Sequence, residues 1–205
     1  MKLFNSGLFK AIYVPPFPGD ESIGLGAASY AYHFLQKNPW KARSPQEQSG
    51  YFGSLLSIPT EEEIRKEFKG FEIIKPDNIE KFAAAHLVEN KIIGWCQGQS
   101  ETGPRALGNR SILARVDSPG LKNRLNGEIK MRENFRPYGC SILHEESHHY
   151  FDVPEGFENP FMSFAVKTRR EFKQALCEVT HFDGTSRMQT VRASQNERFY
   201  KLIKE

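Results

Sequence analysis

The sequence is poor in cysteine and has no long hydrophobic run. Cys96, Cys140 and Cys177 are odd in number, widely spaced and form no CxxC pair. A disulfide framework and a thiolate zinc site are therefore not indicated, and buried reduced thiols are expected. No run approaches the ~18 apolar residues of a membrane span, and the first residues do not resemble a signal peptide. We expect a cytoplasmic protein with no membrane partner.

Two familiar phosphate-binding motifs are also missing. No GK[ST] follows the glycines, as a Walker loop would require, and G-x-G-x-x-G does not occur. Internal repeats and low-complexity segments are absent as well, which argues against a solenoid or a disordered chain. With 205 residues and 39% hydrophobic content, the chain has room for one packed domain, or for one domain and a piece of another.

The chain does have a concentrated positive charge. Residues 101–137 hold eight Lys and Arg against four Asp and Glu, a balance of +4, whereas the whole chain carries only +3. The rest of the chain therefore sums to −1, and the positive potential is confined to one stretch. This confinement favours a bound anion over a generally basic protein.

The residue types in this stretch favour phosphate or acyl-phosphate as that anion. Arginine makes planar, bidentate contacts with phosphate or carboxylate, and lysine adds a compact charge. Gly103 and Gly108 would expose backbone N–H groups able to line an anion site. A solvated helix face explains Lys122 and Arg124, but it explains less well the basic residues that lead into an apolar segment. The residues kept for the anion site are Arg105, Arg110, Lys130, Arg132 and Arg136.

The histidines leave alternatives open. His144, His148 and His149 have a spacing that a metal could use, but they lack a separate third ligand group, so a polar turn is the simpler interpretation. His33 and His86 are expected to pack on helix faces. His181 begins HFDGTSRMQTV, in which Asp183-Gly184 marks a turn followed by side-chain donors. That segment is either a second wall of the anion site or an ordinary hairpin.

Alternating strand and helix signals predict a mixed α/β protein. Strands are expected in 8–14, 51–58, 71–75, 91–98, 110–116, 138–145, 161–168 and 185–191. Helices are expected from Asp20–Ser22 onward, after a Thr60/Glu63 capping box, in 79–90 with Asp77 as cap, in 119–130 with Pro119 in the first turn, and in 196–205. Small residues such as Gly24 and Gly26 would let the first of these helices lie close to another backbone or a ligand.

Three blocks of the sequence resemble the signature blocks of one family. GWCQGQSETGPRALGNRSILA, LNGEIKMRENFRPYGCSIL and HFDGTSRMQTV are similar, in order and spacing, to the C-terminal half of the nodulation and antibiotic O-carbamoyltransferases. VPPFPGDESIGLGAA resembles the last part of that family's large ASKHA-type catalytic domain. The resemblance implies three parts: the tail of an ASKHA-type domain in residues 1–37, a linker in 38–50, and a YrdC-like domain in 51–205.

The resemblance also implies a fold and an activity. The fold would be α/β (α+β), a YrdC-like open twisted mixed sheet with flanking helices around a basic concave cleft. Such domains combine ATP with carbamoyl phosphate to make carbamoyl-adenylate, and the larger domain moves the carbamoyl group to a substrate hydroxyl. Positioning and charge neutralisation carry most of such a reaction, and no protein nucleophile is required.

The same resemblance assigns roles to individual residues. Lys130 and Arg132 match the K-x-R pattern of YrdC-like domains and would be the catalytic residues. Mg²⁺ is expected to accompany ATP. Asp20 falls where the large domain has an acidic ligand, and it would bind an iron-type metal only in the full-length protein. The substrate- and nucleotide-binding residues would be Arg105, Asn109, Arg110, Ser111, Arg136, Thr185, Arg187 and Gln189.

The chain departs from the family pattern at two places. The upstream ASKHA core is missing, so a separate ASKHA-type domain or subunit would have to complete the transfer site. The LLNTSFN-type block that usually follows the closing helix is missing too, which predicts a truncated domain with an incomplete sheet. We expect at most the carbamoyl-adenylate-forming half-reaction, or an inactive fragment.

The other alternative is a basic-cleft RNA-binding module related to YrdC. Only Phe135 is interleaved with the basic residues, which weakens base stacking, so nucleic acid is not the expected partner.

Overall fold

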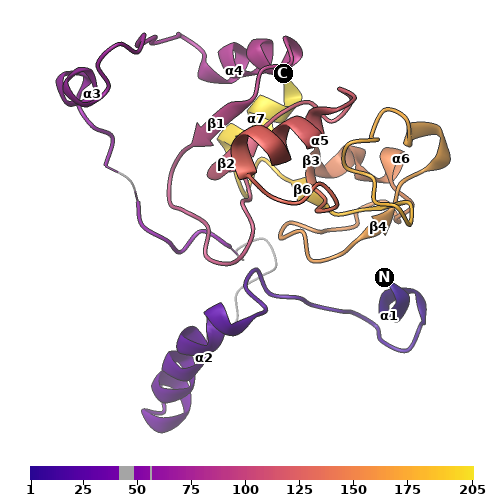
Figure 1. Ribbon diagram of the computed structural model, residues 1–205. Coiled ribbons are helices and arrows are strands. Elements are labelled where there is room, and N and C mark those ends of the chain that lie inside the picture. Colours follow the sequence, from indigo (N-terminus) through magenta and orange to yellow (C-terminus); the bar gives the residue numbers. More distant parts are fainter. Residues whose placement is uncertain (42–48, 56) are drawn as a thin grey trace.

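Helices and short strands alternate along the chain (Figure 1). The computed structural model describes residues 1–41, 49–55 and 57–205. The first half contains α1 (Lys2–Asn5), η1 (Asp20–Ser22), α2 (Ile23–Tyr30), η2 (Ala31–Leu35), α3 (Glu61–Glu67), α4 (Ile79–Val88), β1 (Ile93–Cys96) and β2 (Arg110–Leu113). The second half contains α5 (Leu121–Arg124), η4 (Leu125–Lys130), β3 (Cys140–Leu143), η5 (His144–Glu146), α6 (Ser147–Tyr150), β4 (Val166–Lys167), η6 (Arg170–Phe172), β5 (Thr185–Ser186), β6 (Met188–Val191) and α7 (Glu197–Lys204). The prediction of a mixed α/β protein is confirmed.

The strands pair in three two-stranded sheets. β1 and β2 run antiparallel and place Trp95 opposite Ser111, and β4 and β5 also run antiparallel. β3 and β6 run parallel and place Ser141 opposite Gln189, although 44 residues separate the two strands in the sequence. Among the described strands no pairing closes a barrel. The arrangement is compatible with the open α+β fold that was predicted.

Two apolar clusters hold these sheets in place. One gathers buried residues of β3, β4 and β6 with the segments between them, including Phe151, Val166 and Met188. The other packs α4 and α7 over β1 and includes Trp95 and Phe199. Burying one such side chain stabilises the fold by about 1.5–3 kcal/mol. The clusters therefore fix the ends of β1, β2 and β6, which carry several of the candidate site residues.

The helix starts only partly follow the sequence signals. The capping box at α3 is confirmed, because the Glu63 N–H donates to Thr60 Oγ1 at 3.2 Å and the Thr60 N–H donates to Glu63 Oε2 at 2.7 Å. The cap of α4 is Asn78 instead of Asp77, and its Oδ1 accepts the Lys81 N–H at 2.8 Å. Pro119 precedes α5 instead of lying in its first turn, since the N-cap is Gly120 with a φ of 86°.

Several expected strands do not form. Segments 8–14 and 71–75 have no strand pairing, and in 51–58 only Leu55 makes a single bridge, to Gln99; residue 56 lies outside the described residues. The strand expected in 161–168 is reduced to β4. Apolar runs predict strands, but a strand also needs a neighbour for its backbone groups. Leu55 and Phe71 are 71% and 73% exposed, so these runs lie outside the core.

The three cysteines differ in their surroundings. All are free; Cys140 is buried, whereas Cys96 and Cys177 are exposed. The expectation of buried thiols is therefore wrong for two of them. Burial raises the pKa of the Cys140 thiol to about 12, so this group stays protonated and unreactive at neutral pH.

The N-terminal part is attached to the rest of the chain at a few places. Phe17 is buried, and Gly103 approaches it so closely that an added Cβ would lie 2.8 Å from the Pro16 carbonyl oxygen. Beyond this contact α2 and η2 project away from the sheets (Figure 1). In the described part of the chain, no helix has both the length and the apolar character needed to cross a membrane.

Candidate anion-binding site

The loop between β1 and β2 is folded around its own carboxylate. Glu101 Oε1 accepts the backbone N–H of Leu107 at 2.6 Å, of Asn109 at 2.8 Å and of Arg110 at 3.2 Å. The Gly108 N–H donates to Ser111 Oγ at 3.0 Å. The expectation that Gly108 offers its N–H to an external anion is therefore wrong. A carboxylate that accepts several N–H groups fixes the loop strongly, because each of these hydrogen bonds is charge-assisted.

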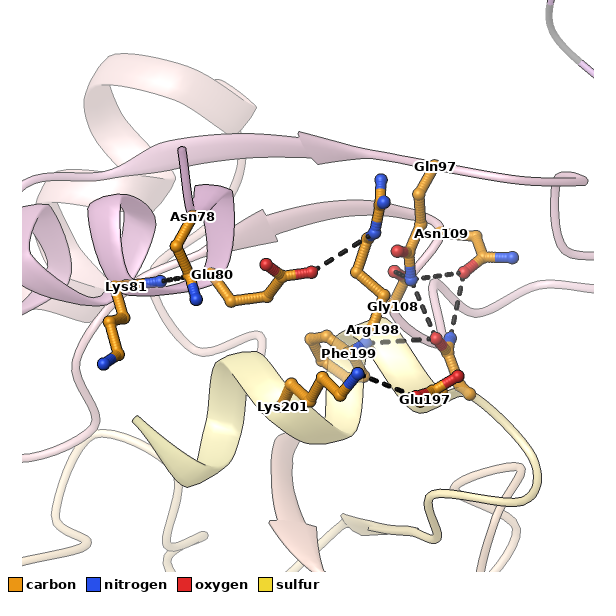
Figure 2. Close-up of polar contacts among 11 residues, drawn as sticks. Asn78, Glu80, Lys81, Gln97, Gly108, Asn109, Glu197, Arg198, Phe199 and Lys201 are labelled. Atoms are coloured by element: carbon orange, nitrogen blue, oxygen red, sulfur yellow. Dashed lines mark hydrogen bonds and ion pairs between the residues drawn. The ribbon is translucent and has the colours of Figure 1, made fainter. Parts of the chain in front are cut away.

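Three predicted ligands mainly hold this loop to its neighbours. Asn109 Oδ1 accepts from Gln97 Nε2 at 3.0 Å and from Asn196 Nδ2 at 2.9 Å, and Figure 2 shows Gln97 and Asn109 meeting at the N-terminal end of α7. The Arg110 guanidinium donates to the Gln97 carbonyl at 2.6 Å and to the Gly98 carbonyl at 3.0 Å. Ser111 accepts the hydrogen bond of Gly108 described above. These groups bind within the chain, and their contact with a ligand stays a prediction.

Glycine is required where this loop meets α7. Gly108 has a φ of 103°, and a Cβ at this position would lie 2.3 Å from Cδ1 of the buried Phe199. Any other residue would collide with the ring and strain the backbone.

Tyr51 closes the other side of the loop, donating its O–H to the Leu107 carbonyl at 2.8 Å. Burial, opposed by a hydrogen bond from Asn196 and assisted by the charge of Glu101, raises the pKa of Tyr51 to about 12.

Arg132 is positioned by the turn that ends η4. Met131 adopts a left-handed conformation with a φ of 46°, and the Arg132 N–H returns to the Asn126 carbonyl at 3.0 Å. The Arg132 Nε–H donates to Asn126 Oδ1 at 2.8 Å. The guanidinium carbon lies 4.5 Å from the centroid of the Tyr138 ring. Arg132 is thus half-buried and held in one orientation.

Arg187 lies between β5 and β6, where a glycine allows a close backbone approach. The Arg187 carbonyl accepts the Cys140 N–H at 3.3 Å, and a Cβ on Gly139 would lie 2.7 Å from the same oxygen. Burial lowers the pKa of Arg187, and the positive charges of Arg105 and Arg132 lower it further. Arg187 thus lies within electrostatic range of Arg105 and Arg132, which come from the other two sequence blocks. We call Arg105, Arg132 and Arg187 the arginine cluster.

The arginine cluster lacks an anionic partner among the described residues. In that part of the chain none of its three members forms a salt bridge, and the Nε atoms of Arg105 and Arg187 are buried without a hydrogen-bond partner. Asn126 Nδ2 and His181 Nε2 are likewise buried and unpartnered. Buried polar groups are normally paired, and neighbouring like charges repel each other. A bound anion with several oxygen atoms would accept hydrogen bonds from the unpartnered nitrogen atoms and would offset the repulsion among the arginines.

The 181–189 segment lies beside the arginine cluster. Burial lowers the pKa of His181; Asp183 opposes this shift, and the charges of Arg187 and Lys122 add to it. His181 Nδ1 lies 3.0 Å from Thr185 Oγ1, whose hydroxyl donates to Asp183 Oδ1 at 2.7 Å. The lowered pKa favours the neutral imidazole, which adds no positive charge beside Arg187. Residues 181–185 therefore form the turn of a hairpin, and this turn lies next to Arg187.

Gln189 connects the two strand systems. Its Nε2 donates to the Leu107 carbonyl at 3.0 Å, and its Oε1 accepts the Ser141 hydroxyl at 2.9 Å. The side chain is buried, so it holds the β1–β2 loop against β6.

Two other residues predicted for the anion site, Lys130 and Arg136, are exposed. Lys130 and Arg136 flank Arg132, and within the described residues neither makes a side-chain hydrogen bond or ion pair. Arg124 is exposed and pairs with Glu128 at 3.1 Å, as expected for a solvated helix face, whereas Lys122 is half-buried. The contact of Lys130 and Arg136 with a ligand stays a prediction.

The described residues contain no group of three or more His, Cys, Asp and Glu side chains that could hold a metal ion. His144 is buried and contacts Arg192, whereas His149 pairs with Glu146 at 2.9 Å. Asp20 is exposed in η1. Its role as a metal ligand stays a prediction.

Sequence reasoning missed the residues that support the site. Glu101 was counted only as a negative charge, although it organises the whole β1–β2 loop. Asn126 and Tyr138 were not singled out, although both contact Arg132. The available signal was their position, since both lie inside the block that contains the K-x-R pattern.

Comparison with known proteins identifies the family. The family model "Carbamoyltransferase C-terminus" matches residues 84–205. Nodulation protein NolNO of Sinorhizobium fredii is 38% identical over 207 residues, covering 98% of this chain and 30% of that protein. Nodulation protein NolO of Bradyrhizobium diazoefficiens is 38% identical over 205 residues, with 98% and 37% covered. Nodulation protein U of Rhizobium tropici is 36% identical over 203 residues, with 99% and 32% covered. The chain thus spans about a third of the length of these relatives, and it belongs to the carbamoyltransferase family as a representative of its C-terminal region.

Proposed function

We propose that this chain is the part of an O-carbamoyltransferase that binds carbamoyl phosphate and ATP and forms carbamoyl-adenylate. The observation that carries the proposal is the arginine cluster, which combines three like charges with buried, unpartnered nitrogen atoms. Carbamoyl phosphate, ATP and pyrophosphate are all polyanions, and guanidinium groups bind their oxygen atoms bidentately. Family membership supports the same class of reaction.

The proposed half-reaction needs charge neutralisation more than a protein nucleophile. Water releases inorganic phosphate from carbamoyl phosphate and leaves carbamate. A carbamate oxygen then attacks the α-phosphorus of ATP, the bond to the β-phosphate breaks, and pyrophosphate leaves. Fixed positive charges stabilise the negative charge that builds up on the transferred group and the leaving group. Mg²⁺ would reach the site on the ATP phosphates, where it usually binds.

Within this reaction the arginines have different parts. Arg105, Arg132 and Arg187 would fix the anion, and the fold already holds Arg132 in one orientation before any ligand binds. Lys130 and Arg136 are exposed and would close on the phosphate groups after binding. The transfer of the carbamoyl group to a substrate hydroxyl would take place in an ASKHA-type domain or subunit, in keeping with the greater length of the relatives.

Calorimetric titration of the chain with carbamoyl phosphate, and separately with MgATP, tests the proposal. We expect both ligands to bind the wild-type chain. Lys130→Ala, Arg132→Ala and Arg187→Ala should each weaken carbamoyl phosphate binding by roughly 10- to 100-fold, because a charge-assisted hydrogen bond contributes about 1.5–3 kcal/mol. Pyrophosphate release from MgATP should require carbamoyl phosphate.

Arg124→Ala is the matched control. Arg124 lies in the same basic stretch, but its guanidinium pairs with Glu128 on the exposed helix face. This variant should bind both ligands as the wild type does. The proposal is wrong if neither ligand binds, or if Arg124→Ala weakens binding as much as Arg132→Ala does.

A further inference from the structure

Arg132 is held by a small clamp that leaves part of its guanidinium free. Its Nε–H donates to Asn126 Oδ1 at 2.8 Å, and the Tyr138 ring lies against the guanidinium plane, 4.5 Å from its carbon. The terminal nitrogen atoms, Nη1 and Nη2, make no hydrogen bond to any other described residue. The clamp therefore occupies the inner edge of the guanidinium and leaves the outer nitrogen atoms for a ligand.

Asn126 is fixed in the orientation that this clamp requires. Its side chain has no exposed surface. Oδ1 accepts from Arg132 Nε and also from the Tyr138 hydroxyl, at 2.7 Å, so both of its lone pairs are used. A rotated amide would place its NH₂ group against the Arg132 Nε–H, and two donors cannot pair. The position of the acceptor is therefore determined by its two partners.

The backbone of Asn126 contributes as well. Its carbonyl accepts the N–H of Arg132 at 3.0 Å, across the turn made by the left-handed Met131. One residue thus binds both the main chain and the side chain of Arg132. The side-chain NH₂ group of Asn126 lacks a hydrogen-bond acceptor, because Nδ2 is buried and has no partner among the described residues. An apolar side chain would fill the same space without leaving a donor unpaired, so packing alone does not explain an asparagine here.

We infer that Asn126 is a positioning residue for Arg132, which it holds with the two terminal nitrogen atoms free to grip the anion. This inference rests on the proposed function for the identity of the ligand, but not for the geometry of the clamp. Preorganisation of this kind raises affinity because the long arginine side chain loses little freedom when the ligand binds.

The clamp can be measured without any ligand by NMR. The Nε–H resonance of Arg132, assigned by its absence in Arg132→Lys, should exchange slowly with water in the wild-type chain. Asn126→Leu, which keeps the volume and removes the acceptor, should accelerate this exchange by about tenfold or more, because a buried hydrogen bond is lost. Asn126→Asp keeps an acceptor and should leave the Nε–H protected. Equal exchange rates in the wild type and Asn126→Leu would overturn the inference.

Binding gives the second readout. Asn126→Leu should weaken carbamoyl phosphate binding by roughly tenfold in the wild-type background and by less than about twofold in the Arg132→Ala background, because coupled residues are not additive. Asn126→Asp should also weaken it, since the new carboxylate competes with the phosphate for Arg132. Equal losses in the two backgrounds would show that Asn126 acts on stability in general and would contradict the positioning role.

One further variant and the exchange rates keep the outcomes separate. If Asn126→Leu does not fold, Tyr138→Phe retains the ring and removes one partner of Asn126 Oδ1. It should then accelerate Nε–H exchange and weaken binding a few-fold, and an unchanged exchange rate would count against the clamp. If the wild-type chain binds no carbamoyl phosphate, the proposed function fails. The exchange rates alone then decide whether Asn126 positions Arg132.

Discussion

At the scale of single residues, the arginine cluster is a compromise between stability and binding. Burial and the charges of Arg105 and Arg132 both disfavour the protonated form of Arg187. Guanidinium groups nevertheless remain charged in proteins, so the fold tolerates the repulsion among three like charges. Groups that destabilise the empty protein in this way are common at functional sites, because a ligand of opposite charge removes the penalty.

This compromise predicts opposite effects of Arg187→Met on stability and binding. The thermal midpoint of the ligand-free chain should stay the same or rise, since a half-buried charge near two like charges is removed while the apolar stem is kept. Carbamoyl phosphate should raise the midpoint of the wild type but not that of the variant. Thermal melts with and without the ligand measure both effects.

Arg115→Met is the control for this prediction. Arg115 donates to both carboxylate oxygens of Asp117, at 2.8 and 2.7 Å, and to the Val88 carbonyl. Its removal should lower the midpoint and leave the response to carbamoyl phosphate unchanged. A lower midpoint for Arg187→Met would show that the arginine cluster is a structural feature, contrary to the prediction.

At the scale of elements, α7 is tied to the site by its N-cap. Asn196 Oδ1 accepts the Phe199 N–H at 3.2 Å and also accepts from Gln97 Nε2 at 2.8 Å. Its Nδ2 donates to Asn109 Oδ1 and to the Tyr51 hydroxyl, at 3.1 Å. The Arg198–Glu80 ion pair joins the same helix to α4 (Figure 2). The closing helix thus determines where the β1–β2 loop lies.

Two asparagine caps allow this role to be measured. Asn78 caps α4 through the Lys81 N–H alone, whereas Asn196 caps α7 and also holds the loop. Asn78→Ala should lower the free energy of unfolding by about 1 kcal/mol, as for an ordinary cap. Asn196→Ala should lower it by about 2–4 kcal/mol, because it removes the hydrogen bonds to Gln97, Asn109 and Tyr51 in addition to the cap. Urea titration measures both values. Equal losses would show that Asn196 is only a helix cap.

The same elements show how far the sequence could predict the fold. Both caps lie at the start of amphipathic segments, so α4 and α7 could be recognised locally. The strand expected in 71–75 could not be excluded from the local sequence, because its apolar pattern is that of a strand. Only the absence of a pairing neighbour among the described residues shows that the strand does not form. Arg105, Arg132 and Arg187 were identified from three separate blocks. Their meeting depends on contacts such as Gln189 to Leu107, which join residues 82 positions apart.

At the scale of the whole molecule, the projecting helix contrasts with the packed sheets. Gly24 and Gly26 were expected to let α2 approach another backbone or a ligand, but an added Cβ would meet nothing within 4 Å at either position. Apolar side chains lie exposed along α2 and η2, including Leu25 at 51% and Phe34 at 68%. The ring of Phe34 stacks on that of Tyr30, with 5.1 Å between centroids. Exposed apolar side chains gathered on one segment promote association in water.

We therefore predict that the isolated chain associates through α2 and η2. The double variant Leu25→Glu/Phe34→Glu should stay monomeric at concentrations where the wild-type mass rises in sedimentation experiments, and it should bind carbamoyl phosphate as the wild type does. The matched control is Phe68→Glu/Phe71→Glu, which changes another exposed pair, at the end of α3. Because that pair is small and separate, its replacement should leave association unchanged. The same rise in mass for all three proteins would place the associating surface elsewhere, and weaker ligand binding by the α2 variant would connect the projecting helix to the anion site.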